Sequence, residues 1–271
     1  MFFAEQRVDD LRRDPGKVID QLPLDIRQQH LFVDLSDHAK RVPDPRPSSN
    51  RGVITEQTLC YDTRMPRPRV HDQDRILDAV ERLAVRSGPA AVTIRAVGDA
   101  TGVSNGALYH TFGSRAGLVG RAWLRAGHRF LGAQGELIDA APEGDGVAAV
   151  VAAAEAPAVF AETHPESSQL LLTVRREELL GPQTPPDIAT QLRDLDRLLV
   201  DTMIRLARLL WDRKDAAAVD VVTACIVDLP TALLLRRNRI DDPDARKRLR
   251  AAVTAVLDAG EPRRKTREES T

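Results

Sequence analysis

The residues that could do chemistry gather in one short stretch, residues 104–111. Asn105 carries a side-chain amide that can pair with N6 and N7 of adenine in a major groove. Gly106 and Ala107 are small enough to let the backbone approach base edges, and the Ala107 methyl group could touch a thymine methyl. These residue types at this spacing indicate contact with double-stranded DNA. Three polar side chains that could reach phosphates follow directly: Tyr109, His110 and Thr111.

Further phosphate contacts are expected around two predicted helix starts. Thr93 and Ser114 each precede a helix, where exposed backbone N–H groups favour an anion. Arg95 and Arg115 add positive charge beside them. Residues 65–130 hold ten basic against five acidic side chains, whereas the whole chain has a net charge of −1. The basic surplus is therefore concentrated where the DNA contacts are expected.

Two short helices must position these residues. Thr93 predicts an N-cap for a helix over 94–100. Residues 101–104 (TGVS) supply a glycine for a tight turn, a valine for the core and the serine cap of a second helix, 105–110. Two such helices joined by a Gly-containing turn predict a helix-turn-helix at about 93–112, which offers the start of its second helix to a major groove.

The rest of the chain is also expected to be helical. An apolar stripe at helical spacing predicts a supporting helix over 72–88, which Gly88 and Pro89 would end. Another helix opens at Ser114, and no strand pattern appears after it. We therefore expect an all-α protein. The remaining expected helices are 147–163, 165–180, 186–212, 216–238 and 243–258.

The composition excludes several classes of protein. Cys60 and Cys225 stand far apart and form no disulfide framework or zinc-binding pattern, so we expect no metal and no cofactor. The start of the chain lacks the pattern of a signal peptide. The longest clean apolar run, 147–154, is much shorter than the ~20 residues that span a bilayer. A soluble, cytoplasmic protein without membrane contact is expected.

The two ends of the chain differ from its centre. Residues 1–64 are rich in proline and mixed charge, and we expect them to be a disordered extension or sequence upstream of a start at Met65. Residues 261–271 are expected to form a flexible tail.

The motif and its flanking helices resemble the N-terminal domain of the TetR/AcrR family of bacterial regulators. The resemblance covers about residues 72–130, roughly a fifth of the chain, and rests on Thr93, the 102–104 turn, the Leu-Tyr pair at 108–109, Phe112 and a basic residue at 115. It implies a DNA-binding domain over 66–130 and an effector-binding and dimerisation domain over 131–260. The DNA contacts expected from the pattern and the resemblance together are Thr93, Arg95, Ser104, Asn105, Gly106, Ala107, Tyr109, His110, Thr111 and Arg115.

Departures from the family pattern concern small residues. Gly98 stands where the family usually has alanine, and Arg115 replaces the commoner lysine. Glycine in a helix interior costs about 1 kcal/mol relative to alanine, so we expect either a soft helix after Ser114 or an early break near Gly132. The five glycines concerned are Gly117, Gly120, Gly127, Gly132 and Gly135.

Dimerisation is expected because one short recognition helix buries too little surface for tight, selective binding. Two apolar stripes in the last helices are the candidate interface, although the same stripes could pack within one chain. The interface candidates are Val219, Val222, Ile226, Leu233, Leu249, Val253 and Val256. Candidate residues for a small-molecule effector pocket are Phe160, His164, Leu171, Met203 and Trp211, although residues of these types are more often plain core.

The function expected from these features is a homodimeric repressor that a small-molecule ligand releases from a palindromic operator. Ligand-relieved repression follows from the resemblance, and an activator is the alternative. A non-catalytic helical interaction protein is a second alternative. An enzyme is not expected, because the chain has no Walker loop, GxSxG, HExxH or spaced acid pair with a histidine.

Overall fold

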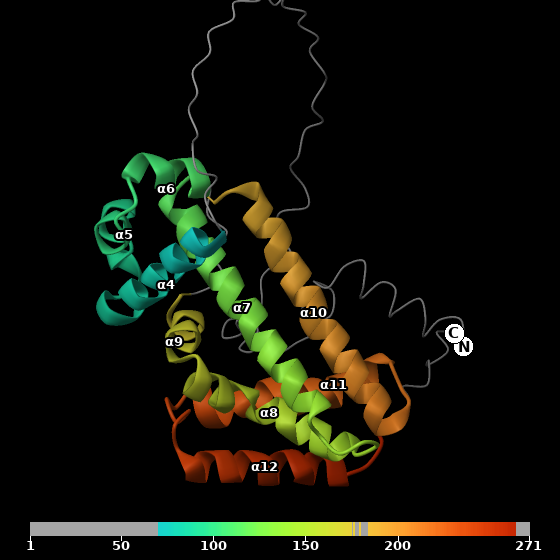
Figure 1. Ribbon diagram of the computed structural model, residues 1–271. Helices are drawn as coiled ribbons and strands as arrows, with labels where there is room; N and C mark the ends of the chain where they lie inside the picture. The colour runs from blue at the N-terminus through green and yellow to red at the C-terminus, as the bar shows by residue number, and fades with distance from the viewer. Residues whose placement is uncertain (1–69, 175, 177–178, 180–183, 264–271) are drawn as a thin grey trace, which may run out of the picture.

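The computed structural model describes residues 70–174, 176, 179 and 184–263. The predictions for residues 1–64 and for most of the tail after residue 260 lie outside these ranges. Every regular element in the described part is helical and none is a strand, so the all-α prediction is confirmed. A head of three α-helices and one short 3₁₀ turn sits at one end of a long helix, and the other end of that helix runs into a larger helical body (Figure 1).

The head is held together by one buried side chain from each of its helices. Val80, Val97 and Leu108 come from three different helices and are fully buried. Gly102 ends the second helix with a φ of 75°, a left-handed conformation that glycine adopts without a steric penalty. The predicted Gly-containing turn is therefore present. The head elements are α4 (Val70–Ser87), η1 (Pro89–Ala91), α5 (Ile94–Thr101) and α6 (Asn105–Phe112).

The long helix α7 (Arg115–Asp139) joins the head to the body without interruption (Figure 1). The expected early break near Gly132 is wrong, because the helix continues through Gly132 and Gly135 to its end. A β-carbon at either of these two glycines would meet nothing within 4 Å. Neither glycine is therefore required by a packing contact.

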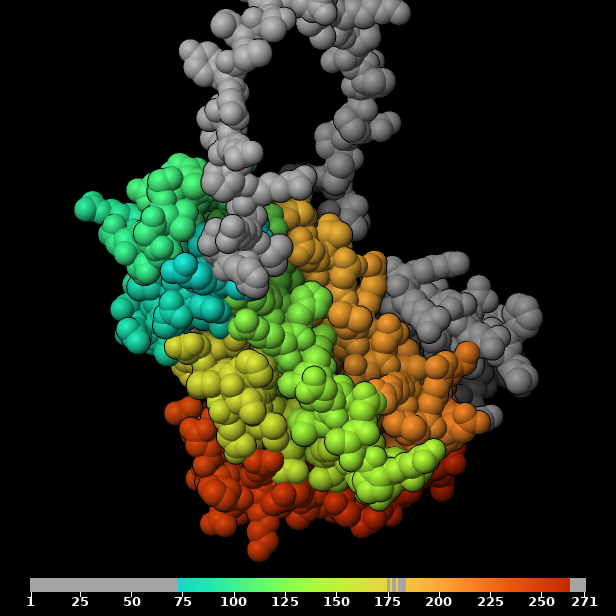
Figure 2. All heavy atoms as spheres, viewed as in Figure 1, coloured from blue at the N-terminus to red at the C-terminus, as the bar shows by residue number. Residues whose placement is uncertain are grey.

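The glycines nearer the head have a packing role against α10 (Pro186–Trp211). A β-carbon on Gly120 would stand 3.0 Å from Cγ2 of Ile188, and one on Gly127 would stand 2.5 Å from Cδ2 of Leu195. The absence of side chains at these positions lets the two long helices approach closely. Figure 2 shows α10 lying along α7 over most of its length.

The described part of the body consists of α10 and six further helical segments. The predicted helix over 165–180 ends early, at Thr173, because Val174 is extended. Around Pro230 the chain stays helical through wide turns, in which the Leu229 N–H donates to the Ala224 carbonyl five residues back. Proline has no N–H to donate, so the regular ladder must shift there. The segments other than α10 are α8 (Gly146–Thr163), α9 (Pro165–Thr173), α11 (Ala216–Thr223), η3 (Ala224–Asp228), η4 (Thr231–Leu235) and α12 (Pro243–Asp258).

Two hydrophobic cores divide the described chain. The first joins the head to α7, the end of α8, α9 and the first half of α10, and Trp123 and Phe160 are its largest buried residues. The second lies among α8, the second half of α10, α11 and α12. Two stretches, Gly146–Thr163 and Ala216–Leu235, are long and apolar enough to cross a membrane by length and composition alone. Both supply side chains to the second core, and this packing accounts for their apolar character.

Most residues of the two stripes expected to form the dimer interface are buried within one chain. The side chains of Val222, Leu249 and Val253 are fully buried in the second core, and Val219 and Ile226 are nearly so. These five residues cannot also form an intermolecular seam, so the interface prediction is wrong for them and the intramolecular alternative holds. Among the seven candidates, Leu233 and Val256 remain partly exposed.

Candidate nucleic-acid interface

Three capped helix starts build the predicted interface. The hydroxyl of Thr93 accepts a hydrogen bond from the Ala96 N–H at 3.0 Å, and that of Ser104 accepts from the Ala107 N–H at 3.3 Å. Ser114 caps α7 in the same way. These caps satisfy N–H groups that a helix start would otherwise leave without an acceptor. The caps predicted at all three positions are confirmed.

Helix α6 is anchored on one side and open on the other. Leu108 and Phe112 are buried in the first core, which fixes the orientation of the helix. The opposite side faces solvent, and 56% of Tyr109 is exposed. The predicted base-reading and phosphate-binding residues of α6 are brought together on this open side. They are Asn105, Gly106, Ala107, Tyr109 and His110, which are exposed. Thr111 is half-buried and lies at the edge of this side, next to α4, α7 and α10.

The missing side chain of Gly98 leaves space for Asn105, the first residue of α6. A β-carbon at Gly98 would stand 2.9 Å from Oδ1 of Asn105 and 2.9 Å from the Val103 carbonyl oxygen. The glycine therefore makes room for the turn and for the amide of Asn105. This close approach explains why alanine, the usual residue of the resembled family, does not fit here without a shift of its neighbours.

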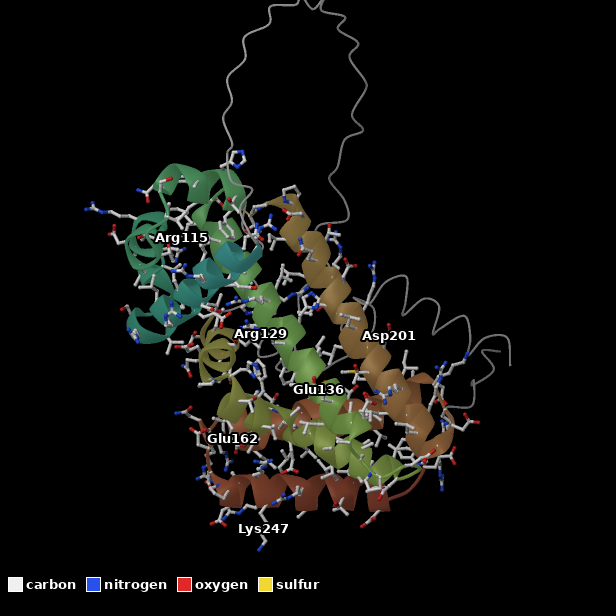
Figure 3. All side chains as sticks on the ribbon, viewed as in Figure 1. Arg115, Arg129, Glu136, Glu162, Asp201 and Lys247 are labelled. Carbon is white, nitrogen blue, oxygen red and sulfur yellow. The ribbon has the colours of Figure 1, made fainter. Side chains whose placement is uncertain are left out.

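The two arginines assigned to DNA differ in their surroundings. Arg95 is exposed over 87% of its side chain, and its nearest carboxylate, that of Asp99, lies 3.9 Å away. Arg115, which Figure 3 labels, instead donates from Nε to the Val92 carbonyl and from Nη2 to the Pro89 carbonyl; these two bonds are not drawn in the figure. Its guanidinium therefore holds the chain that leads into α5. A phosphate contact by Arg115 stays a prediction, and the structure adds a positioning role.

A buried carboxylate beneath the head was missed by the sequence analysis. The side chain of Glu81 in α4 is only 3% exposed and accepts from Nη2 of Arg125 at 2.6 Å. The hydroxyl of Ser167 in α9 donates to the other oxygen of Glu81 at 2.6 Å. Glu81 stands beside the apolar stripe of α4, and an acid in that position was the one sequence signal that could have revealed it.

Two arginines of α7 complete this cluster. Arg125 also bonds Asp78 of α4 at 2.7 Å, and Arg129 lies 3.7 Å from Glu81 (Figure 3). Desolvation lowers the pKa of Arg125. The hydrogen bonds and the electrostatic attraction of Arg125 to Glu81 and Asp78 outweigh that effect, so the pKa is raised overall. The cluster joins the head helix α4 to both α7 and α9, so it connects the DNA-binding unit with the body.

A second buried ion pair lies in the body. Nη2 of Arg176 donates to Oδ2 of Asp196 at 2.7 Å, and both side chains are almost completely buried. Burial raises the pKa of Asp196 to about 6, against the opposing effect of Arg176. Nε and Nη1 of Arg176 and Oδ1 of Asp196 have no hydrogen-bond partner among the described residues. Unsatisfied buried polar atoms are costly, so this pair is a weak point of the body.

The candidate effector residues do not converge on one place. Phe160 packs edge-on against Phe130 and stacks on His164, with ring centroids 5.5 and 5.0 Å apart, and it shares the first core with Leu171. Met203 and Trp211 belong to the second core. Within the described ranges, no group of three or more His, Cys, Asp or Glu side chains is placed to hold a metal ion.

The sequence of the head identifies its family. Residues 76–122, from α4 into α7, match the profile of the bacterial regulatory proteins of the tetR family. The head of this chain is a DNA-binding domain of the tetR family of bacterial regulatory proteins. The matched region contains the capped helix pair, the buried anchors of α6 and Arg115. No curated protein is similar enough in sequence to count as a match.

Solved structures resemble this chain in fold. A TetR transcription regulator from Haloarcula marismortui superimposes with a TM-score of 0.55 at 18% identity, covering 70% of this chain and 97% of its own. The TetR family regulator PfmR from Thermus thermophilus gives a TM-score of 0.51 at 20% identity, covering 71% of this chain and 98% of its own. At such low identity the likeness establishes the fold alone.

Proposed function

We propose that this chain is a homodimeric repressor that leaves a palindromic operator when a small molecule binds its helical body. The observation that carries the proposal is the open side of α6, where Asn105, Gly106 and Tyr109 face solvent from a firmly anchored helix. A β-carbon at Gly106 would meet nothing within 4 Å. Packing inside the described protein therefore does not require glycine there, whereas a base edge approaching the backbone would.

The proposed contacts divide into readout and positioning. Asn105, Gly106 and Ala107 read base edges, and Asn105 pairs with an adenine. The remaining residues set the register of α6 by bonding to phosphates, which carry little sequence information. These phosphate-binding residues are Thr93, Arg95, Ser104, Tyr109, His110, Thr111 and Arg115.

We place the dimer interface on the outer side of the last helices. A two-fold symmetric dimer matches an operator that is a palindrome. Val221, Leu235 and Val256 are partly exposed there, although the next residue on one side of each is buried. Those buried residues are Val222, Leu234 and Leu257. Apolar surface on two neighbouring helices is the kind that an isologous interface covers. A dimer also doubles the DNA contacts and sets the spacing of two half-sites.

Release by a ligand requires a connection between body and head. The Glu81 carboxylate provides one, because Arg125 of α7 and Ser167 of α9 both bond to it. A ligand that displaces α9 would change the hydrogen bonds of the head helix. The proposed effector region lies around Phe160, His164 and Leu171, next to α9, and we place the protein in the cytoplasm with no cofactor and no catalytic activity.

A mobility-shift assay on the DNA that flanks the protein's own gene tests DNA binding. We expect a salt-sensitive complex with the purified full chain. Tyr109→Phe should weaken binding to all sequences, because it removes a phosphate contact. Asn105→Ala should cost about 1–3 kcal/mol and relax the choice of one base pair. Equal affinities of both variants and the unmodified protein would refute the assignment of α6.

Two further measurements test the finer parts of the proposal. Sedimentation equilibrium should give a dimer, and Val256→Asp should shift it towards the monomer. A reporter gene under the flanking promoter should be expressed more strongly when the regulator is deleted. Lower expression on deletion would identify an activator instead.

A further inference from the structure

A cleft of about 240 Å³ opens where the DNA-binding head meets the body. Its walls come from α4 and α6 of the head, from α7 and from the first turns of α10. Figure 1 shows these helices meeting at the head end of α7. The cleft is separate from Phe160, His164 and Leu171, the residues proposed above for the effector region.

The lining combines an apolar floor with hydrogen-bond donors. Leu77, Phe112 and Leu124 form the apolar part, and all three are largely buried in the first core. The polar part consists of Gln73, Thr111, Arg121, Arg125, His128 and Gln191. Arg125 is already bonded to Asp78 and Glu81, so Arg121, His128 and Gln191 are the donors considered below. None of the described lining residues is acidic. This combination suits a molecule with an apolar body and a negatively charged group.

The two donors at the edge of the cleft already hold one carboxylate oxygen. Nη2 of Arg121 donates to Oδ2 of Asp187 at 2.9 Å, and the side-chain amide of Gln191 donates to the same oxygen at 3.3 Å. Nε of Arg121 is buried and has no hydrogen-bond partner in the part of the chain that the structure describes. The guanidinium therefore retains a donor for a second acceptor, and an arginine fork is well matched to a carboxylate.

We infer that this cleft binds a small organic carboxylate, with its charged group on Arg121 and Gln191 and its apolar body on the floor. The volume is below the roughly 300–1,000 Å³ of pockets for drug-sized ligands, so it fits a single-ring or short-chain acid. The bound acid would touch α6, α7 and α10 together and would favour the head orientation seen here. This regulatory consequence rests on the proposed function, whereas the binding itself does not.

Calorimetric titration of the full chain with sodium benzoate tests the inference, with benzamide as the uncharged probe of the same shape. We expect saturable benzoate binding and at least about tenfold weaker binding of benzamide, because a charge-assisted hydrogen bond is lost. Arg121→Gln should weaken benzoate by at least about tenfold. Gln191→Ala should weaken it less, since an uncharged donor is removed.

Arg205→Gln is the matched control. Arg205 of α10 also forms a half-exposed ion pair, with Asp139, but it does not line the cleft. This variant should bind benzoate as the unmodified protein does. Absence of saturable benzoate binding would overturn the inference, as would equal affinities for benzoate and benzamide or unchanged binding by Arg121→Gln.

The DNA assay separates this inference from the proposed function. Benzoate binding with the expected variant effects, but without any operator complex, would refute the proposed function and leave the carboxylate site standing. If Arg121→Gln weakens DNA binding while benzoate never binds, the cleft contacts the DNA backbone and the inference fails. The two failures therefore give different results.

Discussion

Leu195 of α10 fills the space that a β-carbon on Gly127 of α7 would need, with its Cδ2 only 2.5 Å from that position. Leu195 is fully buried, so its side chain has little freedom to withdraw. The glycines of α7 therefore fall into two classes. Gly127 allows helix–helix contact, whereas Gly132 is exposed and has nothing near it.

Alanine should have opposite effects at these two positions. Gly132→Ala should stabilise the protein by about 0.5–1 kcal/mol, because alanine favours the helix and meets no neighbour. Gly127→Ala should be destabilising, since overpacking a core costs about 1–3 kcal/mol and exceeds the helical gain. Urea unfolding of both variants measures the difference. Equal stabilisation by both substitutions would contradict the packing role of Gly127.

Alanine at Gly106 separates folding from DNA binding. The new methyl group would meet nothing in the described protein, so we expect no loss of stability and a gain of up to about 1 kcal/mol. Operator affinity should fall about tenfold, or ~1.4 kcal/mol, because the methyl group stands between the backbone and the base edge. Fluorescence anisotropy with labelled operator DNA measures the affinity.

Gly135→Ala is the matched control for that experiment. Gly135 also has open space around it, but it lies in the part of α7 far from the head (Figure 1). It should gain similar stability and bind operator as the unmodified protein does. Unchanged operator affinity of Gly106→Ala would mean that the backbone of α6 does not approach the bases.

The interface could be predicted from sequence because its signals are local. The caps Thr93, Ser104 and Ser114 and the turn at Gly102 each act within a few residues of chain. The partners of Glu81 lie 44 and 86 residues away, and no local pattern specifies them. The packing role of the α7 glycines could not be predicted for the same reason, because their neighbours in α10 are far away in the sequence.

The predicted dimer interface is wrong for its buried residues, and the physical reason is a different one. An apolar stripe predicts that one face of a helix is covered, but it does not predict whether the same chain or a second chain covers it. Val222 and Val253 have helical spacing that suits an intramolecular core and an intermolecular bundle equally well. Only the burial of these side chains within one protomer decides between the two.

Ser167 should couple the body to the head. Ser167→Ala removes one hydrogen bond from the buried Glu81 carboxylate, and a buried acceptor left unsatisfied costs about 1–3 kcal/mol. We expect faster hydrogen exchange in α4 and a changed operator affinity. Ser168→Ala is the control, because Ser168 is equally part of α9 but does not bond Glu81. Identical exchange of α4 in both variants would count against a coupling role.

Asp196 should make stability depend on pH. Burial raises its pKa to about 6 in the folded protein, whereas an unfolded aspartate titrates near 4. The folded state therefore binds the proton more tightly, and this contribution to stability is complete below about pH 4 and is lost as the pH rises through 6. Two units correspond to roughly 3 kcal/mol.

Asp196→Asn removes this titration while keeping the size of the side chain. The stability of the unmodified protein relative to this variant should fall as the pH is raised from 4 to about 6.5, and should be constant above that range. Urea unfolding at a series of pH values measures the difference. A difference that stays constant across the window would show that the Asp196 carboxyl titrates alike in the folded and unfolded states, and that Arg176 fully offsets its burial.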